Sequence, residues 1–417
     1  MNRSAGFPTI VPASAIGRGR RTSPGNRIVV GVVGTGKMAN DYHLPSLLDM
    51  EDVQVVAVCE VDTKRRLAAK DRVASAYSTE GKATCDDHVD YRDLVSRRDI
   101  DAVLIATPEH QHALPILEAF RHGKDVYCEK PMTLTLTEAK RCMEIARARK
   151  RVFQTGSQQR SNVFGAFREG CEFVRSGRIG RVLSVTVGVA GPSVPCDLPA
   201  EPMEPGLDWD RWLGPAPKRP YSSVLSPRGN HNHFPAWRNY REYSGGGHAD
   251  MGAHFYDIVQ WALGKDDTGP VEIIPPSDPK ATSGVLFRYA DGIEVTHGGP
   301  SGCVFTGTRG TLYLDRGVLR SDPPDLIREP LGAREVHLFR SPGHHRNWID
   351  CIRSRERPVC DVEIGARSNA FTQLGNIAYR LGRRVRWDPD RWDFVGDRAA
   401  SGLMDYERRR GWALPTS

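Results

Sequence analysis

A short apolar run followed at once by a glycine-rich turn is the feature that most constrains the fold. Residues 27–33 (RIVVGVV) lead directly into residues 34–39 (GTGKMA). The length and valine content of the run favour a parallel strand that is buried on both faces. Gly34 would permit the tight turn, Gly36 would let the backbone approach a phosphate, and the following helix would direct its free N–H groups at the anion. The pattern predicts a turn that binds the pyrophosphate of a dinucleotide. The alternative is a strand–turn–helix connection that uses glycine only to make the tight turn and binds no ligand.

Further apolar runs alternate with amphipathic segments up to residue 155. Strands are expected at residues 53–59, 102–106, 126–128 and 151–154, and helices at residues 114–120 and 136–149. Strands that alternate with helices form a parallel sheet with helices on both faces. The sequence therefore predicts an α/β, doubly wound Rossmann domain over residues 27–155, after a flexible N-terminal segment at residues 1–26.

Glu60 follows the second expected strand and bears on the choice of coenzyme. A carboxylate at this position can accept hydrogen bonds from an adenosine ribose and would repel a 2′-phosphate. Lys64, Arg65 and Arg66 follow closely and could instead pair with such a phosphate. NAD is therefore expected, with NADP as the less favoured alternative.

Polar residues follow two later strands, at the edge where ligands lie in open parallel sheets. Thr107 and Pro108 come after the third expected strand, and Lys130, flanked by Glu129 and a proline, comes after the fourth. Lys130 would thus stand where a nicotinamide ring could sit, an arrangement suited to hydride chemistry on an alcohol or carbonyl group. The alternative is a surface lysine that Glu129 neutralises.

A second glycine-rich motif, residues 245–254 (GGGHADMGAH), stands in the other half of the chain. Asp250, His254 and Asp257 are spaced so that they would share one face of a helix. His254 is the best candidate for a proton acceptor, because a histidine exchanges protons near neutral pH. Asp250 could bind a neighbouring hydroxyl group or raise the basicity of His254, whereas Asp257 could serve only to fix the helix. A core histidine satisfied by a helix carboxylate is the alternative.

These two motifs, in this order, resemble those of the glucose–fructose oxidoreductase, inositol dehydrogenase and rhizopine-catabolism (Gfo/Idh/MocA) family. The resemblance extends from about residue 27 to the C-terminus. It implies that Lys130 lies beside the nicotinamide and hydrogen-bonds the reacting hydroxyl group, with His254 and Asp250 as the other catalytic residues. The residues expected to bind the coenzyme are Gly34, Thr35, Gly36, Lys37, Met38, Glu60, Thr107, Pro108, His110, His112, Glu129 and Lys130.

The resemblance also implies that residues 156–417 form a substrate-binding and oligomerisation α+β domain with an open-faced, largely antiparallel sheet. Strands fit residues 182–189, 284–289, 292–297 and 310–314, and helices fit residues 162–176, 339–354 and 364–381. The C-terminal helices of the family return towards the cofactor domain. The exposed face of the sheet would form the contact in a homodimer or homotetramer.

A long connection at residues 191–247 has many prolines and little periodicity. Its tryptophans and tyrosines argue against disorder, because large aromatic side chains need burial or a ligand. They could stack on the apolar faces of sugar rings, or they could pin the connection to the sheet. Substrate contacts are expected from Arg160, Trp237, Arg238, Asp250 and His254.

Composition disfavours several other classes of function. The 417-residue chain has a net charge of +7, but its lysines and arginines are scattered, which argues against nucleic-acid binding. No apolar run is long enough to span a membrane. The nine cysteines have no paired spacing and are expected as buried thiols. His231 and His233 could be imagined with Asp250 and His254 at a zinc site, but no metal is expected, because nothing in the sequence fixes their distance.

The N-terminal residues bear on localisation. Residues 7–15 resemble the end of a twin-arginine export peptide, but the leading arginine pair and the hydrophobic stretch are missing. As written, the chain is expected in the cytoplasm, with periplasmic export as the alternative if an upstream signal has been lost.

The sequence therefore predicts an NAD-dependent oxidoreductase that transfers hydride between nicotinamide and a hydroxyl or ketone carbon of a sugar, polyol or sugar derivative. His254 would take the hydroxyl proton, although Lys130 or an ordered water could replace it as the base. An NAD-dependent glycoside hydrolase is the alternative; it would act by transient oxidation, elimination, water addition and re-reduction, with His231, His233 or Tyr243 as an additional base. A redox-silent protein that uses NAD structurally is a third interpretation.

Overall fold

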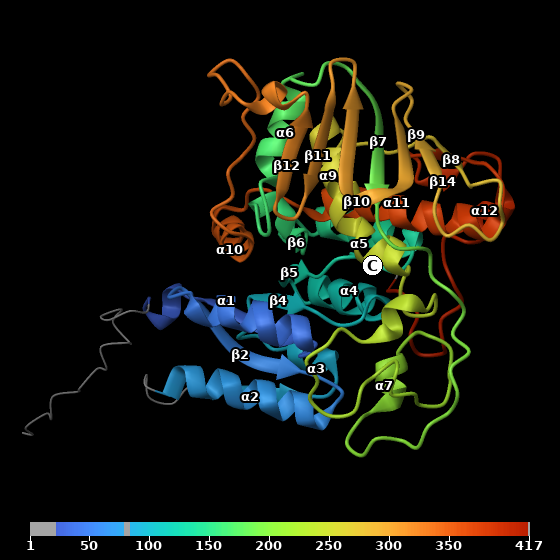
Figure 1. The fold of residues 1–417 in the computed structure, drawn as a ribbon. Helices are drawn as coiled ribbons and strands as arrows, with labels where there is room; N and C mark the ends of the chain where they lie inside the picture. The colour runs from blue at the N-terminus through green and yellow to red at the C-terminus, as the bar shows by residue number, and fades with distance from the viewer. Residues whose placement is uncertain (1–21, 79–83, 416–417) are drawn as a thin grey trace, which may run out of the picture.

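The computed structural model describes residues 22–78 and 84–415, which form two sheets with helices packed against them (Figure 1). The first sheet has six parallel strands in the order β3-β2-β1-β4-β5-β6. These strands are β1 (Ile28–Val33), β2 (Val53–Cys59), β3 (Asp86–His88), β4 (Ala102–Ile105), β5 (Asp125–Cys128) and β6 (Phe153–Thr155). Every residue of β4 and β5 is buried, as continuous apolar runs require when helices cover both faces. The doubly wound parallel sheet expected from the sequence is thus confirmed, while residues 7–15 and most of the segment 1–26 lie outside the described residues.

Helices connect the parallel strands of the first sheet. They are a π-helical turn η3 (Ala39–His43), α1 (Leu44–Asp49), α2 (Thr63–Tyr77), α3 (Tyr91–Val95), α4 (Ala113–Arg121) and α5 (Leu136–Ala148), with 3-10 turns η2 (Pro24–Asn26), η5 (Glu109–Gln111) and η6 (Gln158–Ser161). Local sequence sets where α5 begins. Thr135 Oγ1 accepts the N–H of Glu138 at 3.2 Å, and the Glu138 carboxylate accepts the N–H of Thr135 at 3.1 Å. This reciprocal capping box satisfies two N–H groups that a helix start would otherwise leave unpaired.

The second sheet has eight strands that pair in antiparallel fashion. Its order is β12-β11-β10-β9-β8-β13-β14, with β7 paired to β10. The strands are β7 (Val182–Gly188), β8 (Glu272–Ile274), β9 (Leu286–Arg288), β10 (Glu294–Gly307), β11 (Thr311–Asp315), β12 (Val318–Asp322), β13 (Val385–Asp388) and β14 (Asp393–Phe394). The strand expected at residues 292–297 continues to Gly307, because its first part pairs with β9 and its last part with β11. The antiparallel second sheet is therefore also confirmed.

Further helices belong to the second half of the described chain. They are α6 (Phe167–Arg175), α7 (Trp209–Leu213), α8 (Gly247–Asp250), α9 (Gly252–Leu263), α10 (His344–Ser354), α11 (Val362–Leu381) and α12 (Arg398–Ser401), with 3-10 turns η7 (Ala236–Asn239) and η8 (Pro324–Ile327). The helix α11 contacts both α9 and α5, so it joins the two halves of the molecule (Figure 1). None of the helices in residues 22–78 and 84–415 is long and apolar enough to cross a membrane. The homodimer or homotetramer stays a prediction.

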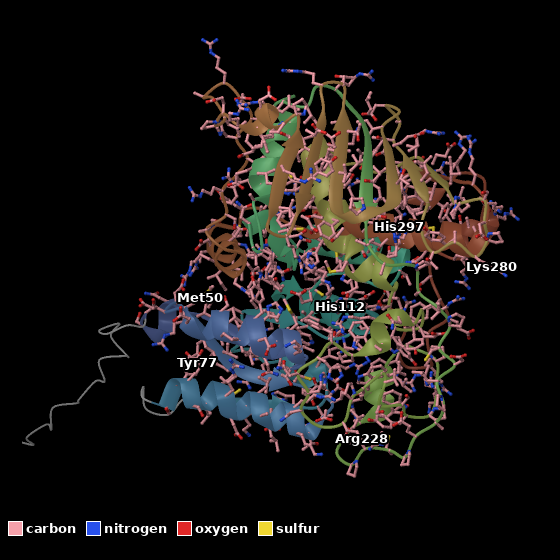
Figure 2. All side chains as sticks on the ribbon, in the orientation of Figure 1. Met50, Tyr77, His112, Arg228, Lys280 and His297 are labelled. Carbon is pink, nitrogen blue, oxygen red and sulfur yellow. The ribbon has the colours of Figure 1, made fainter. Side chains whose placement is uncertain are left out.

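The long connection at residues 191–247 packs around its own aromatic side chains. It runs down beside the first domain, with α7 near its outer part and the labelled Arg228 at the edge of the molecule (Figures 1 and 2). Its buried cluster contains Leu207, Trp212, Leu213, Ala216, Tyr221, Leu225, Trp237 and Tyr243. Most of these aromatic residues therefore hold the connection in place, as one of the two sequence-based interpretations proposed.

Candidate active site

A cavity of about 420 Å³ joins the carboxyl edge of the first sheet to the helices and loops of the second half. The turn after β1, Glu60 after β2, Thr107 after β4 and Lys130 after β5 all contribute to its wall. The opposite wall comes from α8, α9, η7 and the turn between β11 and β12. Because the strands of the first sheet are parallel, their carboxyl ends bring these distant residues to a single edge.

The glycine turn after β1 has the geometry that a dinucleotide corner needs. Gly34 has φ of +86°, and a Cβ there would lie 2.7 Å from the carbonyl carbon of Ala106, so no other residue fits without movement. No atom lies within 4 Å of where a Cβ of Gly36 would stand. Gly36, Lys37 and Met38 line the cavity at the start of the following helix. An anion could therefore approach the backbone at this helix start.

Glu60 and the basic residues that follow it form several hydrogen bonds beside the cavity. The Glu60 carboxylate accepts the N–H groups of Thr35 at 3.0 Å and of Asp62 at 3.2 Å, and it lines the cavity. Arg65 donates instead to the Gly229 carbonyl at 3.1 Å, and Arg66 donates to Asp87 at 3.0 Å. Both guanidinium groups thus already have acceptors within the protein, although Arg65, like Glu60, lines the cavity.

His112 ties the two polar segments of the sheet edge together. Its ring nitrogens lie 2.9 Å from the carbonyl oxygens of Thr107 and Pro131. Burial lowers the pKa of His112, so the ring is neutral near pH 7 and donates its single N–H to one of them. Figure 2 shows His112 near the middle of the molecule, below the second sheet. The contact fixes the segment after β4 against the segment that carries Lys130.

Two residues expected to bind the coenzyme do not line the cavity. Thr35 is fully buried and contributes its N–H to Glu60. His110 is buried against Trp212 and Tyr243, and its Nε2 lies 2.9 Å from the Trp212 carbonyl oxygen. Burial lowers the pKa of His110 to about 4. The structure therefore places His110 in the packing between the first domain and the long connection.

Lys130 and Asp250 meet across the cavity wall. The Lys130 ammonium donates to Asp250 Oδ1 at 2.8 Å and to the main-chain oxygen of Asp250 at 2.7 Å. Arg238 Nε lies 3.6 Å from the same carboxylate oxygen. Burial alone would raise the pKa of Asp250, but Lys130 and Arg238 outweigh it and lower the pKa to about 2. Asp250 is therefore a carboxylate throughout the neutral pH range.

His254 lines the cavity beside this pair, on the first turn of α9. Burial, followed by the positive charges of Lys130 and Arg316, lowers the pKa of His254 well below its ordinary value. Its Nδ1 is buried and has no hydrogen-bond partner among the described residues. The imidazole is thus neutral near pH 7 and able to accept a proton or a hydrogen bond.

Asp257 does not share the cavity face with Asp250 and His254. The helix expected across all three residues is interrupted at Met251, where α8 gives way to α9. Asp257 is fully buried and accepts Arg160 Nε at 2.8 Å. It therefore acts in a buried ion pair, consistent with the structural role considered for it.

The expected substrate contact at Arg160 is not supported by its position. Its side chain is 1 % exposed, and its guanidinium donates to Asp257 and, at 2.6 and 2.9 Å, to Asp266. Arg160 does not line the cavity. Its charge is already balanced by two carboxylates, so it is not available to a substrate. Trp237 and Arg238 do line it, with the Arg238 guanidinium 4.2 Å from the centre of the Trp237 ring.

Glu109 is a cavity residue that sequence reasoning missed. It follows Pro108 directly, and its carboxylate accepts Ser244 Oγ at 2.5 Å and the N–H of Gly245 at 3.1 Å. Burial raises the pKa of Glu109 to about 7. Glu109 thus holds the second glycine motif against the first domain. Its position directly after Thr107 and Pro108 was the only feature of the sequence that could have indicated this contact.

The histidines considered for metal binding lie in the long connection. His231 lines the cavity, and its ring centre is 4.8 Å from that of His233. Among residues 22–78 and 84–415 there is no group of three or more His, Cys, Asp or Glu side chains that could hold a metal ion.

Part of the chain is similar in sequence to known enzymes. Inositol 2-dehydrogenase of Salmonella typhimurium is 33% identical over 157 residues, which cover 37% of this chain and 44% of that protein. The 2,7-anhydro-N-acetylneuraminate hydratase of Mediterraneibacter gnavus is 28% identical over 36% of this chain and 37% of its own length. The chain thus matches less than half the length of these relatives.

Solved structures share the whole architecture at low identity. The WlbA dehydrogenase from Bordetella pertussis, in complex with NADH and UDP-GlcNAcA, has a TM-score of 0.61 and 19% identity, covering 87% of this chain and 99% of that one. The aldose–aldose oxidoreductase from Caulobacter crescentus has a TM-score of 0.58 and 17% identity, covering 86% and 99%. These similarities establish the fold.

Two family models match consecutive parts of the chain. Residues 28–157 match the NAD-binding Rossmann fold of an oxidoreductase family, and residues 174–414 match the C-terminal alpha/beta domain of the same family. The two matched segments carry the glycine corner with Lys130 and the motif with Asp250 and His254, respectively. With both domains matched in order, the chain belongs to the Gfo/Idh/MocA family of NAD-binding oxidoreductases.

Proposed function

We propose that the protein is an NAD-dependent dehydrogenase that acts on a hydroxyl or ketone carbon of a sugar, polyol or sugar derivative. The observation that carries this proposal is the contact between Lys130 and Asp250 beside His254, in a cavity that extends to the glycine corner. An ammonium group, a carboxylate and a neutral imidazole can together bind a hydroxyl group and remove its proton.

The residues of the first domain fit a dinucleotide. Gly36 leaves open space at the helix start for a phosphate, and Glu60 lines the cavity with a carboxylate suited to a ribose diol. Thr107, Pro108 and His112 would hold the part of the coenzyme nearest to Lys130. When bound, the nicotinamide supplies the hydride acceptor or donor. NAD is proposed over NADP, because the Glu60 carboxylate lines the cavity while Arg65 and Arg66 already donate hydrogen bonds to oxygen atoms of the protein.

The two domains together provide the groups that would handle the substrate hydroxyl, with Lys130 from the first and Asp250 and His254 from the second. We propose that Lys130 donates a hydrogen bond to the hydroxyl oxygen while Asp250 holds the ammonium in place. His254 would accept the hydroxyl proton, since its lowered pKa keeps the ring neutral. Lys130 and Asp250 are held by their mutual hydrogen bonds before the substrate arrives, so little reorganisation of this pair is needed when the reacting atoms meet.

A second candidate function is an NAD-dependent glycoside hydrolase that works by transient oxidation and elimination. The similarity to a hydratase of an anhydro sugar favours keeping this alternative. It needs an additional base near the carbon next to the oxidised one. Of the three candidates, His231 lines the cavity, whereas His233 and Tyr243 do not.

Turnover assays separate the two candidates. The purified protein with NAD would be incubated with a panel of sugars, polyols and uronates, and separately with aryl glycosides. Accumulation of NADH with a free sugar or polyol supports the dehydrogenase. Release of the aryl group without net NADH supports the hydrolase, and failure to bind either coenzyme in a fluorescence titration would contradict both.

A further inference from the structure

Three basic side chains line the part of the cavity around Asp250 and His254, together with the carboxylates of Asp250 and Glu129. Lys130, Arg238 and Arg316 all line the wall here. Lys130 and Arg238 share the single carboxylate of Asp250, at 2.8 and 3.6 Å. Arg316 lies close enough to influence the pKa of His254, and it forms no ion pair with any residue that the structure describes. Its sequence neighbour Asp315 accepts the main-chain N–H of Arg316 at 2.7 Å, and the charges of Asp315 and Asp250 act on the Arg316 guanidinium without forming an ion pair with it.

The turn that carries Arg316 is held firmly in place. Arg316 and Gly317 are the two residues between β11 and β12, and the Gly317 N–H donates to the Phe164 carbonyl at 2.9 Å. A Cβ at Gly165 would lie 3.1 Å from the Gly317 nitrogen, so the two segments are in close contact. The Arg316 guanidinium stacks 4.7 Å from the centre of the Phe164 ring. These contacts direct a preorganised cation at the cavity.

Phe164 is itself in an unusual position. Its backbone has φ of +74°, a conformation that is unfavourable for any residue with a Cβ. The side chain is nevertheless 54 % exposed and lines the cavity. Phe234, 53 % exposed, lies across the same cavity and is covered by Arg238 at 4.9 Å. Backbone strain that presents an apolar ring to solvent at a cavity indicates a ligand-binding role.

From these contacts we propose that the substrate is a carbohydrate that carries an anionic group, a carboxylate or a phosphate, and that Arg316 binds this group. A guanidinium presents two parallel N–H donors that match the oxygens of either anion. The Phe164 ring would contact the apolar face of the sugar. This inference rests on the proposed function, because it concerns the substrate of the same cavity.

The test measures binding to the full-length protein by calorimetry, with and without NADH. The probes are glucuronate, glucose 6-phosphate and neutral glucose, so that carboxylate and phosphate are distinguished. We expect at least one of the two acids to bind about tenfold more tightly than glucose, because charge-assisted hydrogen bonds add to the shared sugar contacts. Arg316→Gln should remove that advantage by weakening the binding of the acids about tenfold more than the binding of glucose, while Arg316→Lys should retain part of it.

Arg320→Gln is the matched control, since Arg320 lies on β12 and stacks on Tyr313 but does not line the cavity. It should bind all three probes as the unmodified protein does. Equal binding of glucose and the acids, no measurable binding of either acid, or the same loss in the Arg316 and Arg320 variants would overturn the inference. Failure of NADH to bind would instead refute the proposed function. The preference for acids over glucose could still be measured in the titrations without coenzyme.

Discussion

The Lys130 ammonium donates two hydrogen bonds to Asp250, one to the side-chain Oδ1 at 2.8 Å and one to the main-chain oxygen at 2.7 Å. This contact joins the loop after β5 to the end of α8, so it links the two domains at the cavity. A lysine held by both a side chain and a backbone oxygen has little freedom to turn away. The position of the ammonium beside His254 is therefore a property of the folded protein rather than of a flexible side chain.

Replacing Lys130 by alanine should abolish most of the activity without loss of coenzyme binding. Removing a group that positions a hydroxyl and assists proton transfer costs about 10²- to 10⁴-fold in kcat. Steady-state kinetics on a sugar that is turned over, together with a fluorescence titration of NADH, would measure both effects. Lys218→Ala, at an exposed position outside the cavity, is the control. Unchanged kcat in the Lys130 variant would contradict the role proposed for Lys130, whereas the absence of turnover of any sugar by the unmodified protein would favour the redox-silent interpretation.

Glu60 should control the choice between NAD and NADP. Its carboxylate lines the cavity and would repel a 2′-phosphate, so we expect NAD to bind more tightly than NADP. In Glu60→Ser the ratio of the dissociation constants for NADPH and NADH should fall by about tenfold, because the substitution removes both the acceptor for the ribose hydroxyls and the repulsion of the 2′-phosphate. Dissociation constants for NADH and NADPH would be compared in the two proteins. A preference for NADPH in the unmodified protein would contradict this expectation.

Glu109 should make the stability of the protein fall as pH rises. Burial raises its pKa from an ordinary value of 4.5 to about 7, so the folded protein binds more protons than the unfolded chain between these values. The stabilisation is complete below pH 4.5 and is lost as pH rises through about 7, by roughly 3 kcal/mol in the free energy of unfolding. Glu109→Gln should lack this loss, and its stability relative to the unmodified protein should increase over the same range. Urea unfolding of both proteins at several pH values measures the difference, and a difference independent of pH would refute the assignment.

Arg160 should be essential for stability but not for substrate recognition. Removing one member of a buried ion pair leaves an uncompensated charge and costs about 3–5 kcal/mol. Arg160→Met would strand Asp257, which is fully buried, and Asp266. Denaturant unfolding should show the loss, while the KM of the protein that remains folded should change little. A large change in KM with normal stability would restore the substrate contact expected from the sequence.

The family resemblance and local patterns predicted the fold well. The valine-rich runs at β1 and β2, the glycine turn at Gly34 and the polar residues after β4 and β5 all depend on short stretches of chain. Helix starts were placed less accurately. The helix expected from residue 339 begins at His344, and the one expected from residue 162 begins at Phe167. Apolar periodicity marks the buried face of a helix but does not mark its ends.

The catalytic roles of Lys130, Asp250 and His254 stay predictions, although the structure brings all three to one cavity. His110 shows why sequence position alone is insufficient. It stands two residues from His112 in the sequence, yet it packs against Trp212 of the long connection, about a hundred residues away. Such contacts depend on how the connection folds over the sheet, and no local pattern encodes that path.

The sequence by itself determined the backbone: a parallel sheet, the corner after its first strand, and a lysine at the carboxyl end of another strand. These features follow from steric rules and burial patterns that act over a few residues. Tertiary structure alone decided which charged side chains lack an ion-pair partner. Arg160 is neutralised by Asp266, 106 residues later, whereas Arg316 lines the cavity without an ion-pair partner among the described residues. Whether a charged side chain meets a partner or remains available for a ligand depends on packing between distant segments, because charges interact through space and not along the chain.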